Sequence, residues 1–345
     1  MLTFSPRRNP NRQPARTARR IGAAVIVIAI LAVTASCARH PATVSLPQFT
    51  DETAIVDQLD DTLPFNPTNE FIFPSVFHAG AHFANPLGEW YLYYGPHDAP
   101  GGIALMYADS LDGPWTQYDK SPVISNEWTG HYSVSHVASP DTVWNENEET
   151  MFLYFHGENT ETRFATSDDG ITFEYGDTII DTDDVTAAQP GRTATEVSYA
   201  RVFANPDENS HYGWAMFFMA NYDDDIRRID KAYSTDGRTW EVQPDVIVNP
   251  GKAEGQNVSG ADLLRWEGND YVVYGSSSGT IFARAINEGL SSTGVPVSIY
   301  VPSDSPPENG RAAAPEIVSD GLATHLFFEM GQRSHTTIGH ATATG

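Results

Sequence analysis

The chain has 345 residues, and its 45 acidic side chains outnumber the 20 lysines and arginines, which gives a formal net charge of −25. Nucleic acids and anionic membrane surfaces are bound through clustered cations, so this composition argues against both as partners. The one cysteine, Cys37, excludes an internal disulfide and any site built from several thiolates.

Residues 1–37 have the successive basic, apolar and small-residue regions of an export signal. Six arginines and no acidic residue come first, and the apolar run over residues 21–33 that follows is too short to span a membrane comfortably. The run ends in Thr34-Ala35-Ser36-Cys37, which resembles a bacterial lipoprotein signal in which Cys37 is lipidated and becomes the first mature residue. We therefore expect a lipid-anchored protein of the bacterial cell envelope. Ordinary cleavage near Ala38, giving a secreted or periplasmic protein, and an uncleaved anchor are the alternatives.

Residues 38–66 lack a long hydrophobic period and are expected to form a tether. From residue 67 to residue 345, short β-rich runs alternate with clusters of Gly, Asp, Asn and Pro, and no helical period is sustained. Without the first 36 residues the formal charge becomes −31. We interpret this acidic surface as a solubility feature, with binding of cations or of a basic partner as the alternative.

The β-rich runs repeat five times. Each repeat opens with a small residue followed by a polar one; the small residues are Pro74, Pro140, Ala200, Ala261 and Pro315, spaced 66, 60, 61 and 54 residues apart. An aromatic-rich strand follows each of them, at residues 90–94, 151–155, 214–218, 271–274 and 325–328. Three repeats then carry an Asp-Gly hairpin turn, which precedes Trp115, Phe173 and Trp240.

Four strands in each of five repeats predict an all-β fold, a five-bladed β-propeller of four-stranded antiparallel blades over residues 67–345. The fifth repeat stops after its third strand, at Gly345. A segment within residues 41–60 is the candidate for the missing strand, because pairing there would protect an open sheet edge.

Two stretches of the second repeat carry a family resemblance. Residues 136–144 (HVASPDTVW) and 152–157 (FLYFHG) are similar to the second blade of the five-bladed propeller glycosidases, especially glycoside hydrolase family 43 and its relatives. The resemblance covers residues 68–345. It implies hydrolysis of O-glycosidic bonds in a carbohydrate, with no required cofactor, and it allows a structural cation near the propeller axis. The family's catalytic carboxylates do not carry over, because their positions hold Phe73, Tyr199 and Ser259.

Topology predicts where ligand-binding groups gather. The innermost strands of a propeller start on the ligand face, and the loops between second and third strands return to it. Glycoside hydrolysis needs two carboxyl groups across the bond. We expect them among Asp98 and Glu196, the leading pair, and Glu158, although each carboxylate alternatively caps a turn or pairs with an arginine. The expected substrate-binding residues are His97, His136, His156, Tyr199, Arg201, Arg311 and Trp128, the last by stacking on a sugar ring.

Asp141, Asp262 and Glu316 occupy equivalent positions in three repeats. This periodicity favours pairing or capping between blades over contact with substrate. No metal site is predicted, since His78 and His82 lie four residues apart in a strand-turn region and not on a helix.

The leading hypothesis is an exported glycoside hydrolase that acts on a glycan or oligosaccharide through paired carboxylates in the central funnel. The alternative is a surface lipoprotein that binds sugar without turnover, which the missing family carboxylates favour. A propeller serving as a protein-interaction platform is a third class, and it would more often expose an apolar patch. We expect a monomer that contacts the membrane only through its lipid.

Overall fold

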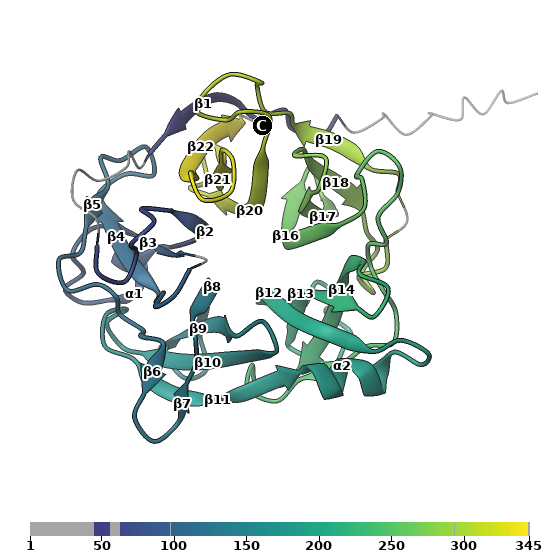
Figure 1. Cartoon of the computed structure of the whole chain (residues 1–345), viewed down its shortest axis with the longest axis horizontal. Coiled ribbons are helices and arrows are strands. Elements are labelled where there is room, and N and C mark those ends of the chain that lie inside the picture. Colours follow the sequence, from purple (N-terminus) through teal and green to yellow (C-terminus); the bar gives the residue numbers. More distant parts are fainter. Residues whose placement is uncertain (1–44, 56–62, 97, 293, 344–345) are drawn as a thin grey trace, which may run out of the picture. The chain divides into compact units, whose positions relative to one another are not determined.

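The computed structural model describes residues 45–55, 63–96, 98–292 and 294–343. Two predicted functional residues, Cys37 and His97, lie outside this described part. Five four-stranded antiparallel sheets surround a common axis and form the five-bladed β-propeller that the sequence predicts (Figure 1). Neither helix within the described residues is long and apolar enough to cross a membrane.

Each blade is a meander whose first strand lies innermost (Figure 1). Blade 1 contains β2 (Ile72–Phe77), β3 (Trp90–Gly95), β4 (Ala104–Ala108) and β5 (Thr116–Gln117). Blade 2 contains β8 (Val137–Asn145), β9 (Thr150–Gly157), β10 (Glu161–Ser167) and β11 (Glu174–Asp181). Blade 3 contains β12 (Ala194–Ala204), β13 (Trp214–Tyr222), β14 (Arg227–Ser234) and β15 (Glu241–Val242).

Blade 4 contains β16 (Val258–Trp266), β17 (Asn269–Ser276), β18 (Ile281–Ala285) and β19 (Val297–Tyr300). Blade 5 contains β20 (Ala312–Ser319), β21 (Thr324–Met330) and β22 (Thr337–Ala343). The connections hold the helices α1 (Ala79–His82) and α2 (Thr182–Ala188) and a small hairpin of β6 (Glu127–Trp128) and β7 (Tyr132–Ser133).

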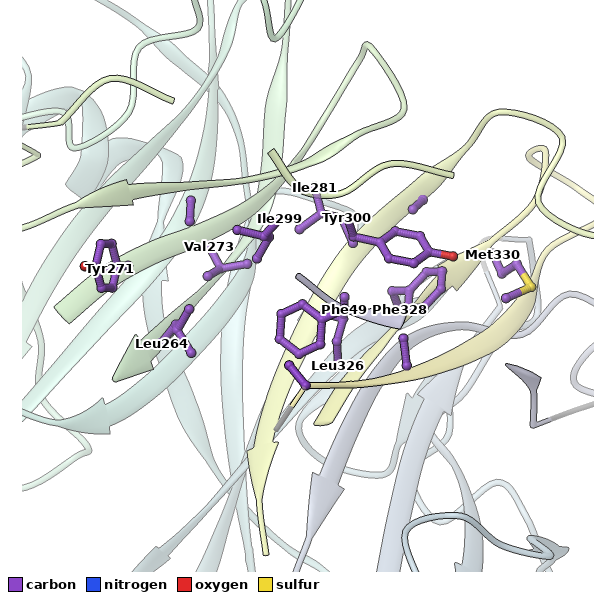
Figure 2. Packing of buried hydrophobic residues seen from close by; sticks show 14 residues of the cluster. Phe49, Leu264, Tyr271, Val273, Ile281, Ile299, Tyr300, Leu326, Phe328 and Met330 are labelled. Carbon is purple, nitrogen blue, oxygen red and sulfur yellow. The ribbon is translucent and has the colours of Figure 1, made fainter. Parts of the chain in front are cut away.

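An N-terminal strand completes blade 5. β1 (Thr50–Ala54) pairs antiparallel with β22, with Thr53 opposite His340. The side chain of Phe49, just before β1, packs between blades 4 and 5 against residues that include Tyr300 and Phe328 (Figure 2). The ring of blades is therefore closed by joining the two ends of the domain, and the outer edge of β22 is paired rather than open.

Aromatic second strands form the core between neighbouring blades, and the Asp-Gly turns lie against them. Tyr93 of β3 donates its hydroxyl to the carbonyl of Gly170 at 2.6 Å, and Tyr154 of β9 donates to that of Gly237 at 2.7 Å. Gly170 has φ +71°, and a Cβ there would lie 2.8 Å from the Tyr93 Oη. The turn thus needs glycine both for its backbone conformation and for the close approach of the neighbouring blade.

All five inner strands share one irregularity near their start. A residue with positive φ occurs at the same position in each strand, and the pairing register with the second strand shifts there. These residues are Phe73, Ser139, Tyr199, Gly260 and Ala314, with φ between 42° and 56°. The bulge changes which side chains point to the axis, and the residues two positions later come to the centre of the propeller.

Those central residues join each blade to the next. Asp141 accepts the main-chain N–H of Val202 at 2.7 Å. In the same way Asp262 accepts that of Ile317 at 2.7 Å, and Glu316 accepts that of Val76 at 2.9 Å. The role between blades that the sequence periodicity predicts for these three carboxyl groups is confirmed.

Blade 3 has an arginine at the equivalent position. Arg201 donates hydrogen bonds of 2.7 Å to the carbonyls of Pro74 and Pro140, and its guanidinium lies 3.3 Å from carboxylate oxygens of both Asp141 and Glu316. The side chain is only 6% exposed. Arg201 was expected to line the ligand-binding mouth, but the structure places it inside the axis, where it links blade 3 to blades 1, 2 and 5.

Candidate active site

The two ends of the axis differ in what fills them. We call the end at which the inner strands begin the start face, and the opposite end the end face. At the start face three rings pack together, with Phe73 and His156 buried and Tyr199 partly buried: the rings of Phe73 and Tyr199 lie 4.9 Å apart, and that of His156 lies 5.9 Å from Tyr199. Burial, with Glu329 as the next cause, holds the pKa of Tyr199 well above its usual range, so its phenol is neutral.

A small polar cavity of about 80 Å³ lies beside this layer. We call it the arginine pocket. It is lined by Tyr199, Arg227, Ser259, Arg311, Ala313, Ala314, Glu329 and Arg333, which come from blades 3, 4 and 5 and from the loop after β21. The Nη2 of Arg311 lies 2.6 Å from a carboxylate oxygen of Glu329. Arg311, a predicted substrate-binding residue, therefore lies at this face in an ion pair with Glu329.

Glu196 is a buried, ion-paired carboxylate of the start face. It belongs to β12 and is 7% exposed. Arg227 Nη2 lies 2.9 Å from its Oε2, and the hydroxyl of Ser198 donates to its Oε1 at 3.1 Å. Arg227 is itself positioned, since its main-chain N–H donates to Asn257 Oδ1 at 2.9 Å. Such partners stabilise the ionised carboxylate.

Glu158 lies in the tight turn between β9 and β10. Both Glu158 and Asn159 have left-handed backbone conformations, with φ of 56° and 60°. The main-chain N–H of Ser135 donates to Glu158 Oε1 at 2.9 Å, and the carbonyl of Asn159 accepts the N–H of Val197 at 2.7 Å. Because Val197 follows Glu196, the two glutamates flank one backbone hydrogen bond between blades 2 and 3.

The predicted histidines extend this polar face toward blade 1. His136 lies 3.0 Å from the Ser135 hydroxyl and 3.4 Å from Asn159 Oδ1, and its ring centre is 5.8 Å from that of His156. Asp98 lies exposed in the neighbouring loop of blade 1. That loop packs on the start of β8, since a Cβ at Gly101 would lie 3.3 Å from the His136 Cβ. Asp98 is therefore at the margin of the site, whereas Glu158 and Glu196 each precede one partner of the hydrogen bond between Asn159 and Val197.

Trp128 is not part of this face. It belongs to the β6–β7 hairpin, and its ring packs 5.5 Å from that of Tyr175 on β11, the outermost strand of blade 2 (Figure 1). The expectation that Trp128 stacks on substrate at the central mouth is not supported by this location. The hairpin adds chain outside the four-strand repeat, which the repeat pattern does not reveal.

A larger cavity of about 510 Å³ opens at the end face. Its walls include stacked pairs, His78 on Trp90 at 4.1 Å and His82 on Trp144 at 4.4 Å, and the axial carboxyl groups lie in its floor. This cavity was not predicted from the sequence, because propeller topology places the ligand face at the end where the inner strands begin.

Two carboxyl groups in the floor of this cavity have raised pKa values. Burial raises the pKa of Asp141 to about 6 and that of Glu316 to about 8, and Arg201 opposes both shifts. Perturbed carboxyl groups mark catalytic sites, but buried ion-pair networks shift pKa values as well. Since each of these acids accepts a main-chain N–H of the next blade, we assign them to the framework.

One cluster within the described residues has the composition of a metal site. Asp112, His325 and His340 lie at the junction of blades 5 and 1, outside the funnel. His325 Nδ1 and His340 Nε2 are 2.8 Å apart, and burial lowers the pKa of His340 to about 4. With His340 neutral, the short contact fits a direct hydrogen bond between the two imidazole rings. The cation near the axis that the family resemblance allows stays a prediction.

Comparison with known proteins finds similar folds among solved structures. No family model matches the sequence, and no curated protein matches it. Among solved structures, one described as a glycoside hydrolase has a TM-score of 0.64 at 15% identity, covering 87% of this chain and 92% of that one. An α-L-arabinofuranosidase from Lactobacillus brevis gives 0.57 at 13% identity, covering 83% and 94%. A thermostable family-43 glycoside hydrolase gives 0.52 at 13% identity, covering 79% and 88%.

The protein is therefore a five-bladed β-propeller of the architecture found in those glycoside hydrolases. The resemblance inferred from the second repeat is confirmed for the fold. At this level of identity the likeness shows the fold alone, so activity has to be inferred from the residues of the start face.

Proposed function

We propose that the protein is an exported glycoside hydrolase whose active site is the start face of the propeller. The observation that supports this best is that Glu158 and Glu196 directly precede the two residues, Asn159 and Val197, whose hydrogen bond joins blades 2 and 3. Both glutamates are carboxylates in a cluster of histidines and arginines, as a polar polyhydroxylated substrate requires.

The two glutamates differ in a way that suits different roles. Glu196 is buried and ion-paired with Arg227, so it serves as the ionised group that takes a proton from water or attacks the anomeric carbon. Glu158 is exposed and accepts one main-chain N–H through Oε1, and we assign to its Oε2 the role of donating a proton to the leaving glycosidic oxygen. A carboxyl separation of about 6.5–9.5 Å would give inversion, and about 5–5.5 Å retention.

The remaining predicted residues act on the sugar. His136 offers an imidazole at the surface of the site, and the layer of His156, Tyr199 and Phe73 forms its floor. Asp98, from blade 1, is the alternative partner of Glu196. No cofactor takes part in this scheme.

The test is a screen of plant, algal and bacterial cell-wall glycans for released sugar, repeated with Glu196→Gln, Glu158→Gln and Asp98→Asn. Loss of a true acid or base should lower the rate by about 10²–10⁴-fold. Glu149→Gln is the matched control for Glu158, because Glu149 is also exposed with positive φ in a hairpin turn of the same blade, at its opposite end. Wild-type rates in both glutamate variants would refute the assignment.

A second function has one observation in its favour. Phe73, Tyr199 and Ser259 stand where the resembled family has its carboxylates, which is what a propeller that binds sugar without turnover would show. Measurable glycan binding with no released sugar on any substrate, and weaker binding in the variants, would support this lectin-like reading over hydrolysis.

We further propose that the mature protein is a monomer anchored through lipid on Cys37 and facing outward from the cell membrane. The arginine-rich start, apolar run and small-residue series before Cys37 support this.

A further inference from the structure

We propose that the arginine pocket binds the anionic group of an acidic glycan, either the carboxylate of a uronic acid or a sulfate ester. This inference rests on the proposed function and names the substrate class for the same face. It starts from the distribution of positive charge in an acidic protein.

Positive charge is scarce in this chain and concentrated here. The net charge is −25 and there are three lysines. Of the ten arginines in the described residues, three (Arg227, Arg311 and Arg333) line one cavity of about 80 Å³. A surface this acidic repels anionic sugars at long range, so a local cluster of arginines is the feature that would let it accept one.

The three guanidinium groups are not equally compensated. Arg227 pairs with Glu196 and Arg311 with Glu329, yet their side chains remain 32% and 24% exposed. Arg333 is exposed in the loop after β21, and no carboxylate within the described residues forms an ion pair with it. The pocket therefore carries one positive charge beyond those its ion pairs cancel.

The size and the other lining groups fit an anionic substituent rather than a whole sugar. Pockets that enclose drug-sized ligands measure about 300–1,000 Å³, far more than this cavity. The hydroxyl of Ser259 and the neutral phenol of Tyr199 also line it and are hydrogen-bond donors. Planar guanidinium groups match carboxylate and sulfate oxygens in geometry as well as in charge.

The pocket is also adjacent to the proposed chemistry. Arg227 both lines it and pairs with Glu196 at 2.9 Å, so a bound anion would lie one side chain away from the catalytic carboxylate. The acidic sugar would accordingly occupy the cleaved residue or its immediate neighbour.

Binding measurements test this without requiring turnover. Galacturonate, glucuronate and galactose 6-sulfate would be titrated into the purified protein by calorimetry, with galactose and methyl galacturonate ester as neutral counterparts. Arg333→Gln should weaken binding of the anionic ligand about tenfold or more and leave neutral sugars unaffected, while Arg333→Lys should retain part of the affinity. Arg265→Gln, an exposed arginine that lines the end-face cavity, is the control.

The outcomes separate this inference from the proposed function. Preference for the uronates identifies the carboxylate, and preference for the sulfate identifies the ester; both support the pocket. Equal binding of acidic and neutral sugars, or unchanged affinity in Arg333→Gln, overturns it. Cleavage confined to neutral glycans would support the hydrolase function and refute the anion site. Uronate binding without cleavage of any glycan would support the anion site and refute the hydrolase function.

Discussion

Replacing Arg201 by methionine should destabilise the propeller severely. The substitution leaves Asp141 and Glu316 in the axis without their shared cation, and it removes the donors to the Pro74 and Pro140 carbonyls. Breaking a buried ion pair from one side costs about 3–5 kcal/mol. In a domain of this size each kcal/mol shifts the melting temperature by about 2 °C, so we expect a fall of about 6–10 °C at pH 8.

The penalty should depend on pH. With Arg201 present, the pKa of Asp141 is already raised to about 6 and that of Glu316 to about 8 by burial, and loss of the cation raises both further. A carboxyl group whose pKa is higher in the folded state than in the unfolded state favours folding when protonated. This contribution is present at low pH and is lost as the pH rises through the folded pKa. The deficit of the variant should therefore shrink between pH 8 and pH 5.

Thermal unfolding followed by circular dichroism at pH 5 and pH 8 measures both effects. Arg265→Met is the control, since Arg265 is 59% exposed and lies 3.6 Å from Asp270; a pair of that kind is worth about 0–1 kcal/mol. A variant Arg201→Met that melts within about 2 °C of the wild type at pH 8, or that loses the same stability at both pH values, would refute this account of the axis.

Two further predictions concern the N-terminal part of the chain. Phe49→Ala removes a ring that is 5% exposed between blades 4 and 5, so urea unfolding should show a loss of about 3–5 kcal/mol and hydrogen exchange should quicken in β1 and β22. A loss below about 1 kcal/mol would mean that closure of the ring does not depend on this contact. Cys37→Ala should move the protein from the membrane fraction to the soluble fraction or block its processing, and unchanged sedimentation with membranes would count against lipidation.

The architecture was predictable because each repeat contains residues that predict its strands and its turns. A small residue, a polar residue and an aromatic strand recur at near-constant spacing, and the Asp-Gly turns need glycine for the reasons seen at Gly170. The shared irregularity of the inner strands was not predictable. Residues as different as Phe73, Ser139 and Ala314 adopt the same positive φ, so nothing in their side chains signals it.

That irregularity explains the error at Arg201. Simple alternation along β12 would give Tyr199 and Arg201 the same environment, but the register with β13 shifts between Ser198 and Arg201. Tyr199 consequently lies in the layer at the start face, while Arg201 turns into the axis. Arg227 was not predicted as a site residue for another reason. It is the first residue of a third strand, β14, whereas the predicted positions were the starts of the inner strands and the loops after the second strands.

The side chains around Phe73, Tyr199 and Ser259 explain why carboxylates would not suit these positions, which hold carboxylates in the family that the sequence resembles. A carboxylate at position 73 would be buried against Tyr199 and His156, and burying a charge without a partner is strongly unfavourable. Arg227 is already paired with Glu196, and Arg201 lies among the acids of the axis. The chain instead has rings at this end of the axis, and Glu196 on β12 pairs with Arg227 next to the hydrogen bond between Val197 and Asn159. Under the proposed function, the candidate site therefore lies at the boundary between blades 2 and 3 and not at the positions of Phe73, Tyr199 and Ser259.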